Sequence, residues 1–253
     1  MITISHLIGF SVVLIGAVAL ALYGIRYRER LPEARRFPVF RPLSHEVGKA
    51  AEEGALIHIA LGNGAVTGEN AMVSVAALEG LTALCDLSAA YDTPPIITTG
   101  DPTLYVLADD WMRRAYARLG NAQRYRPTLV QFTAATPAAY AAIAATYLYE
   151  KGVGSNIMLG AFGQEISLLA EAAARRGTFC AGGTTSPESL GALYPTLNSS
   201  QLAIGEELFA GGAEVIDHPT YWAGLWSQDL LRWIVIGGMI IIALLQVLGI
   251  KVG

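Results

Sequence analysis

Charged side chains are scarce in this chain of 253 residues. Asp, Glu, Lys and Arg make up 15% of it, whereas a typical soluble domain contains about 25%. Membrane helices alone do not explain this shortfall, so we expect other subunits to cover part of the outer surface. The net charge of −4 argues against a nucleic-acid partner, because neutralising phosphates requires a basic surface.

Cysteine and histidine are also sparse. Cys85 lies in a predicted helix and Cys180 in a predicted strand, and they form no C-x-x-C pair. We interpret both as small buried thiols, which implies neither a disulfide nor a metal site. None of the four histidines has the spacing of a metal-binding pair. His58, inside a predicted strand, is better explained as a core histidine with internal hydrogen bonds than as a catalyst.

No motif in the chain specifies a reaction. A G-x-S-x-G nucleophile elbow does not occur. The sequence therefore identifies no catalytic residue, no metal site and no cofactor. It leaves enzymatic activity undecided, and the lack of a catalytic motif favours a non-enzymatic protein.

Two long apolar runs lie near the ends of the chain. Residues 4–25 contain no Asp, Glu, Lys or Arg, and residues 230–248 form a second run with Arg232 near its start. Each is long enough to cross the ~30 Å hydrocarbon core of a bilayer as a helix. A secretory signal peptide would carry its positive charges before the apolar run, whereas here they follow it. We therefore predict a transmembrane helix at each end and a lipid bilayer as a partner.

Arginines determine the predicted orientation of both helices. Five of them follow the first run, namely Arg26, Arg28, Arg30, Arg35 and Arg36. By the positive-inside rule the chain after this run is cytoplasmic and both termini are outside. The prediction is a two-pass protein of the cell (inner) membrane, with a basic juxtamembrane stalk at 26–42, a cytoplasmic domain at 43–216 and an interfacial linker at 217–229.

Between residues 43 and 216, short apolar runs alternate with longer Ala- and Leu-rich stretches. Runs that are apolar on both faces are typical of a parallel sheet covered by helices on both sides. The predicted fold is α/β, a mostly parallel, doubly wound, Rossmann-like sheet of about six strands. A helix at Ser44–Glu53 precedes it. The predicted strands are Leu56–Leu61, Pro95–Thr99, Thr128–Phe132, Asn156–Gly160, Thr178–Ala181 and Gln201–Ile204.

Basic residues collect at the ends of the predicted helices, whereas the turns after the strands carry acidic ones. The helix dipole explains this pattern, since it favours acids in first turns and bases in last turns. We further expect the stalk and the return to the second membrane helix to attach at the N-terminal edge of the sheet. Its basic edge would then face anionic lipid head groups.

Open α/β sheets bind ligands beyond the C-terminal ends of their strands. The turn after the first predicted strand has a G-x-G-x-x-x-G pattern at Gly62, Gly64 and Gly68, which invites a dinucleotide site. No acidic residue closes the second strand and no P-loop lysine follows these glycines, so tight turns explain them better. The candidate ligand-binding residues are Gly62, Asn63, Gly64, Thr99, Asp101, Gly163, Gln164, Glu165, Thr184 and Thr185.

Two carboxylates are the first of these candidates to test. Glu165 and Asp101 are placed to hold a divalent cation or to bind a polyol. Helix capping explains Asp101 equally well, because Pro102 follows it at a position suited to the first turn of a helix.

Several sequence blocks carry a resemblance to a known family. They are A-L-E-G-L-T-A-L from Ala77, P-P-I-I-T-T-G-D-P-T from Pro94, M-L-G-A-F-G-Q-E from Met158, G-G-T-T-S-P from Gly182 and I-G-E-E-L-F-A-G-G-A from Ile204. Over roughly residues 42–226 the chain resembles an uncharacterised group of prokaryotic membrane-anchored proteins with a cytoplasmic domain of unknown function. The resemblance implies a membrane location and the same α/β domain, but no activity, substrate or catalytic residue.

Low surface charge and small residues in the apolar runs lead to our first functional hypothesis. It is a non-enzymatic, membrane-anchored protein that self-associates into a homo-oligomer. The alternative is an enzyme or sensor that binds a small polar ligand, nucleotide or cation at the C-terminal edge of the sheet. A further alternative is a subunit of a larger transport or secretion complex.

Overall fold

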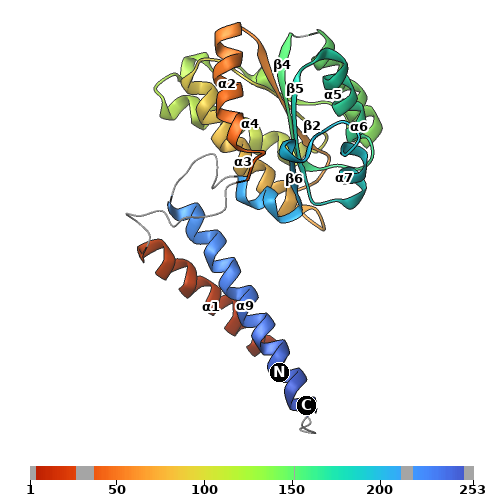
Figure 1. The fold of residues 1–253 in the computed structure, drawn as a ribbon. Helices are drawn as coiled ribbons and strands as arrows, with labels where there is room; N and C mark the ends of the chain where they lie inside the picture. Colours follow the sequence, from red (N-terminus) through yellow and green to blue (C-terminus); the bar gives the residue numbers. More distant parts are fainter. Residues whose placement is uncertain (1–3, 27–36, 151, 212–218, 248–253) are drawn as a thin grey trace. The chain divides into compact units, whose positions relative to one another are not determined.

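The computed structural model describes residues 4–26, 37–150, 152–211 and 219–247, and the chain divides into two compact units (Figure 1). One unit comprises residues 35–216 and contains the sheet. The other is made from the two ends of the chain, residues 1–34 and 217–253. The first unit includes the whole of the predicted α/β domain.

The sheet has six strands, all parallel, in the order β3-β2-β1-β4-β5-β6. Every predicted strand is present, and the largest differences are three residues, at the start of β4 and at the end of β5. The strands are β1 (Leu56–Gly62), β2 (Ile96–Thr99), β3 (Val130–Phe132), β4 (Val153–Ala161), β5 (Phe179–Thr184) and β6 (Leu202–Ile204). This order is that of a doubly wound, Rossmann-like sheet, so the predicted fold class of the α/β unit is confirmed.

Helices cover both faces of the sheet, as Figure 1 shows. On one face lie α2 (Arg41–Glu53), α3 (Ala71–Ala90) and α4 (Pro102–Arg118), and on the other α5 (Pro137–Glu150), α6 (Ile166–Arg176) and α7 (Pro187–Leu193). Successive strand residues point to opposite faces, so Ile57 and Ile59 pack under the first layer while Ala60 packs under the second. Short 3-10 turns complete the unit: η1 (Ala122–Arg124), η2 (Pro127–Leu129), η3 (Ser199–Gln201) and η4 (Gly205–Ala210).

Polar side chains cap the starts of two helices, and the cap at Asp101 is one that the sequence predicts. The Asp101 carboxylate accepts hydrogen bonds from the backbone N–H groups of Thr103 and Leu104 and so caps α4. The Ser186 hydroxyl accepts one from Ser189 and caps α7. Capping therefore accounts for Asp101, one of the two carboxylates proposed as ligand-binding residues.

Both ends of the α/β unit lie at the C-terminal edge of the sheet. α2 packs along β1 and leads through Gly54 and Ala55 into its first residue, so the start of α2 lies near the edge where the strands end. η4 follows β6 at that same edge, and a Cβ on Gly211, after η4, would lie 2.9 Å from the ring of Phe40, before α2. The expectation of attachment at the N-terminal edge is therefore wrong, because a helix that precedes and packs along the first strand must start at the strand's far end.

Several arginines of the α/β unit pair with carboxylates on the protein surface. These exposed pairs contribute little to stability, but they neutralise much of the positive charge that was expected to face lipid. The pairs are Arg113 and Arg114 with Asp110, Arg118 with Asp86, Arg124 with Asp92, and Arg175 with Glu171.

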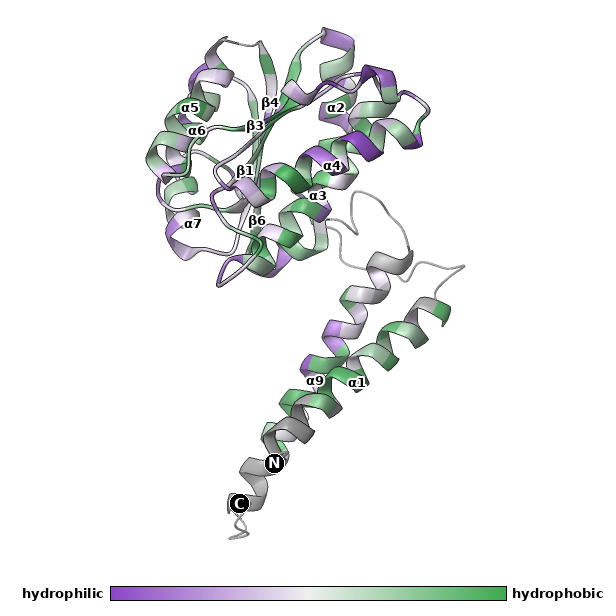
Figure 2. Cartoon of the chain, turned by 180° about the vertical axis from the view of Figure 1, so that it is seen from behind, coloured by the Kyte–Doolittle hydropathy of each residue, from purple (hydrophilic) through white to green (hydrophobic). Residues whose placement is uncertain are grey.

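The second unit contains two long helices, α1 (Ile4–Arg26) and α9 (Pro219–Val247), which pack against each other (Figure 2). A Cβ on Gly16 of α1 would lie 3.2 Å from Cδ1 of Leu231, so glycine allows α9 to approach closely. Many of the described apolar side chains of both helices are exposed, among them Val13 at 70% and Trp233 at 71%. The segment predicted as an interfacial linker is helical from Pro219 onwards.

One helix among the described residues combines the length and the apolar composition needed to cross a membrane, and that helix is α3. Most of α3 is buried in the α/β unit, as expected of a core helix. In α1 the corresponding apolar stretch is shorter, residues 10–23. The transmembrane helix predicted at each end is therefore not confirmed and stays a prediction, whereas the helices themselves are present.

Candidate functional site

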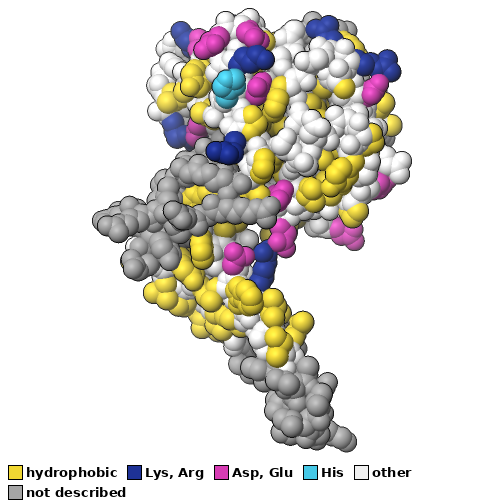
Figure 3. All heavy atoms as spheres, in the orientation of Figure 1, with side chains coloured by type: hydrophobic (Ala, Val, Ile, Leu, Met, Phe, Trp, Pro, Cys, Tyr) yellow, Lys and Arg dark blue, Asp and Glu magenta, His cyan; other side chains and the backbone are white. Residues whose placement is uncertain are grey.

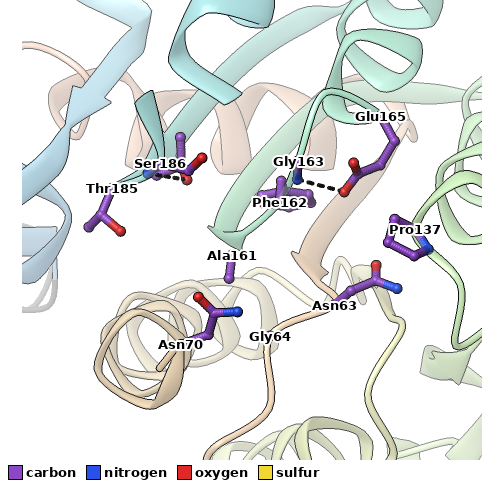
Figure 4. Close-up of a pocket in the computed structure, with 11 residues that line it drawn as sticks. Asn63, Gly64, Asn70, Pro137, Ala161, Phe162, Gly163, Glu165, Thr185 and Ser186 are labelled. Carbon is purple, nitrogen blue, oxygen red and sulfur yellow. Dashed lines mark hydrogen bonds between the residues drawn. The ribbon is translucent and has the colours of Figure 1, made fainter. Parts of the chain in front are cut away.

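A cavity of about 300 Å³ opens at the C-terminal edge of the sheet, between the ends of β1, β4 and β5 (Figure 4). β1 and β4 are adjacent in the sheet, and the helices that follow them cover opposite faces. Such a switch point is the usual ligand site of doubly wound sheets, because the two turns diverge and leave a crevice. The cavity is lined by Asn63, Gly64, Asn70, Pro137, Ala161, Phe162, Gly163, Glu165, Thr184, Thr185 and Ser186.

The cavity brings together some of the predicted site residues and leaves others out. Those that line it are Asn63, Gly64, Gly163, Glu165, Thr184 and Thr185. Gly62, Thr99, Asp101 and Gln164 do not line it. Thr99 is buried and donates to the Gly62 carbonyl oxygen (3.3 Å), and the Gln164 carbonyl accepts from Ser167 (2.8 Å). Ligand binding by the residues that do line the cavity stays a prediction.

Five lining residues are not among the predicted candidates: Asn70, Pro137, Ala161, Phe162 and Ser186. Ala161, Phe162 and Ser186 belong to the strand-end turns from which the candidates were chosen, whereas Asn70 and Pro137 lie outside those turns. Pro137 comes from the start of α5, on the far side of the switch point. Only the strand order places it beside the β1 and β4 turns, so no local signal indicated it.

The glycines of the turn after β1 allow the backbones of β1 and β4 to approach closely. Gly62 has φ +74, and a Cβ there would lie 2.2 Å from the Ala161 carbonyl oxygen. A Cβ on Gly64 would lie 2.6 Å from that of Ala161 and 2.7 Å from Oγ of Ser74. Side chains at these positions would force the ends of β1 and β4 apart. The structure therefore supports the tight-turn interpretation of the G-x-G-x-x-x-G pattern.

Among the residues that the structure describes, Glu165 is the one charged residue that lines the cavity. Its Oε1 accepts a hydrogen bond from the backbone N–H of Gly163 at 2.8 Å, as drawn in Figure 4. Its Oε2 lies 2.6 Å from the point that a Gly163 Cβ would occupy, so the carboxylate folds tightly over this turn. A backbone donor at the start of α6 is thus already used by a negative charge of the protein itself.

Asn63 connects three of the strand-end turns. Its backbone N–H donates to the Ala161 carbonyl (3.0 Å) and its Nδ2 donates to the Ala135 carbonyl (3.2 Å). Gly100 leaves room for this side chain, since a Cβ there would lie 2.3 Å from Nδ2. Oδ1 of Asn63 is buried and has no hydrogen-bond partner among the described residues. The residue itself lines the cavity.

A buried chain of hydrogen bonds runs beneath the cavity. The backbone N–H of Gly62 donates to the Tyr140 hydroxyl (3.2 Å), which lies 3.3 Å from Oγ1 of Thr98. Thr98 Oγ1 in turn lies 2.9 Å from Nε2 of His58. Desolvation on burial raises the pKa of Tyr140 to about 12, so this hydroxyl keeps its proton.

The chain continues from His58 to β4 and β5. Nδ1 of His58 lies 2.7 Å from Oδ1 of Asn156, whose Nδ2 donates to Sγ of Cys180 (3.5 Å). Because Asn156 offers its oxygen, the proton sits on Nδ1 of His58, and Nε2 accepts from Thr98. Desolvation by burial lowers the pKa of His58 to about 4, partly opposed by the bond to Asn156. The interpretation of His58 as a core histidine with internal partners is confirmed.

A family model described as a domain of unknown function, DUF6754, matches residues 3–253. The chain belongs to this family. The match covers nearly the whole of this protein, including both terminal helices. It therefore extends beyond residues 42–226, the stretch that carries the sequence resemblance. No curated protein and no solved structure matches it.

The cavity of this DUF6754 protein is lined by amide, hydroxyl and carboxylate side chains. Glu165 is its one titratable side chain, and the residues lining it include no histidine, cysteine or lysine beside its hydroxyl groups. No group of three His, Cys, Asp or Glu residues suited to a metal ion occurs in the part of the chain that the structure describes. Glu165 is therefore the one candidate general base among the described residues that line the cavity with the hydroxyls of Thr184, Thr185 and Ser186.

Proposed function

We propose that this DUF6754 protein is anchored in a membrane by α1 and α9 and binds a small polar ligand at the β1–β4 switch point of its α/β unit. The observation that carries the proposal is the cavity itself. It lies where the two halves of the sheet diverge, and amide, hydroxyl and carboxylate side chains line it together with the ring of Phe162. Ligand sites combine such convergent polar groups with an apolar wall.

Ligand binding is tested by screening small polar metabolites against the detergent-solubilised full chain. The readout is ligand-induced thermal stabilisation, and each hit is measured again on Thr185→Trp, which fills the cavity. Thr146→Trp is the matched control, because Thr146 is exposed in the later part of α5 and does not line the cavity. We expect hits that lose stabilisation in Thr185→Trp alone. A screen without hits, or hits that both variants retain, would contradict the proposal.

Membrane anchoring is supported by the exposed apolar side chains of α1 and α9. Exposing such apolar surface to water costs roughly 25 cal/mol per Å², and contact with lipid chains removes this cost. We expect the full chain to stay in the membrane pellet after alkaline carbonate extraction. Val13→Arg on α1 should weaken insertion by about 3 kcal/mol, while Val106→Arg, at an exposed position of α4, should not. Full recovery of the unmodified chain in the supernatant would refute anchoring.

Self-association is a second candidate function, as a homo-oligomeric assembly or as part of a larger complex. It is supported by large apolar side chains exposed on the α/β unit. Figure 3 shows hydrophobic areas on one face of this unit in yellow. The exposed side chains include Met72, Val75, Val106, Phe132, Leu168 and Tyr194. Light scattering of the solubilised particle, corrected for detergent, tests it. A uniform multiple of 26.8 kDa supports assembly, and a monodisperse monomer rules it out.

A further inference from the structure

We infer that the ligand of the switch-point cavity is a small organic cation, an amine that also carries hydroxyl groups. The inference rests on the proposed ligand-binding function and names the chemical class of the ligand. Three features of the cavity carry it: the sign of its charge, the direction of its hydrogen-bonding groups and its size.

The charge of the cavity is negative. Glu165 lines it, and the described part of the chain contributes no Lys, Arg or His to its lining. Other acidic residues follow the strands at this edge, with Asp101 at the start of α4 and Glu188 in the first turn of α7. Arg41 begins α2 at the same edge but does not line the cavity. A cation entering here is attracted, whereas a phosphate or carboxylate meets a like charge.

The hydrogen-bonding groups of the cavity also favour a ligand that donates hydrogen bonds. Asn63 lines the cavity, and its buried Oδ1 has no hydrogen-bond partner among the described residues, so turning this oxygen towards a ligand N–H or O–H would satisfy an acceptor that is otherwise costly to bury. The Gly163 N–H, which an anion would need, is already bonded to Glu165. An anionic ligand would have to displace that carboxylate, while an ammonium group can bind to it directly.

The size of the cavity restricts the ligand to a small molecule. About 300 Å³ accommodates a single sugar ring or a compound of similar size. The neighbouring hydroxyls of Thr184, Thr185 and Ser186 both donate and accept, which suits ligand hydroxyl groups. Phe162 supplies an apolar wall against which a ring can pack.

Three sugars with one ring and different charges test the inference: glucosamine, glucose and glucuronate. Their dissociation constants are measured by calorimetry on the solubilised full chain at about pH 6, where a sugar amine is protonated. We expect glucosamine to bind about tenfold more tightly than glucose, as one favourable charge interaction provides, and glucuronate to bind most weakly. Glu165→Gln should remove the difference between glucosamine and glucose.

A second variant keeps the test decisive if Glu165→Gln disturbs the turn. Asn63→Asp adds a negative charge at the cavity and should increase the preference for glucosamine. Equal binding of all three sugars, a preference for glucuronate, or a glucosamine preference that both variants leave unchanged would overturn the inference. Failure of all three sugars to bind would overturn it as well. The metabolite screen decides separately whether the cavity binds any ligand, so the two failures remain distinguishable.

Discussion

Nδ1 of His58 lies 2.7 Å from Oδ1 of Asn156, the residue directly opposite it on β4. The two residues are 98 positions apart in the chain, and both are completely buried. Burial, not this bond, keeps the histidine neutral at the centre of a sheet whose other core positions are mostly apolar, because the bond itself raises the pKa of His58. The bond joins the two halves of the sheet beneath the switch point.

The first prediction concerns pH. The pKa of His58 is lowered from 6.5 to about 4 in the folded protein, so between these values the unfolded chain binds more protons. Its contribution to stability is fully present above about pH 6.5 and is lost as the pH falls towards 4, by about 3 kcal/mol in all. Thermal unfolding of the full chain across this range measures it. His58→Leu should flatten the profile, and His45→Gln, at an exposed position, should leave it unchanged.

The second prediction separates steric conflict from backbone strain. Gly62 and Gly68 have similar φ values, +74 and +79, but a Cβ meets the Ala161 carbonyl at Gly62 and nothing within 4 Å at Gly68. Gly68→Ala should cost about 1 kcal/mol from the left-handed conformation alone. Gly62→Ala should cost at least about 2 kcal/mol more, because β1 and β4 must move apart. Equal losses of thermal stability in the two variants would contradict this account.

The third prediction concerns Gly100 and Asn63. Gly100→Ala should displace the Asn63 carboxamide from the Ala135 carbonyl and cost about 1–3 kcal/mol. In an Asn63→Ala background the same change should cost much less, because the obstructed side chain has gone. A double-mutant cycle of unfolding free energies measures this coupling. Additive effects would show that the two residues do not interact.

The fourth prediction concerns the hydroxyl beneath the cavity. Tyr140→Phe removes the group that accepts from the Gly62 N–H, leaving that donor unpaired in a buried site at a cost of about 1–3 kcal/mol. Tyr149→Phe is the matched control, since Tyr149 lies on the same helix and is 47% exposed. Amide hydrogen exchange at Gly62 should accelerate in the first variant only. Unchanged exchange there would mean that the Tyr140 hydroxyl does not hold the β1 turn.

The elements of the α/β unit could be predicted because their signals are local. Each strand is a short apolar run bounded by turn residues. Asp101 and Ser186 indicate where α4 and α7 begin, because each side chain accepts a hydrogen bond from a backbone N–H two or three residues later. The same local information indicated that polar turns follow the strands. Six of the ten candidate residues line one cavity, and their role in ligand binding stays a prediction.

The error at the sheet edge has a physical cause. The side of the sheet at which a chain enters depends on the helix before the first strand, not on the strand pattern. α2 packs along β1 and therefore brings Phe40 to the edge where the strands end, beside Gly211. Nothing local to the stalk carries that information.

The amino-acid sequence by itself determined the strands, the helix starts, the buried thiols and the apolar character of the chain's two ends, since each depends on neighbouring residues and on residue periodicity. Only the tertiary structure decided which turns meet. The order β3-β2-β1-β4-β5-β6 places Asn63 beside Phe162 at the cavity and gives His58 its partner on β4, because strand pairing joins residues that are far apart in the chain. The sequence therefore indicates which side chains follow the strands, but the order of the strands decides which of them line the cavity together.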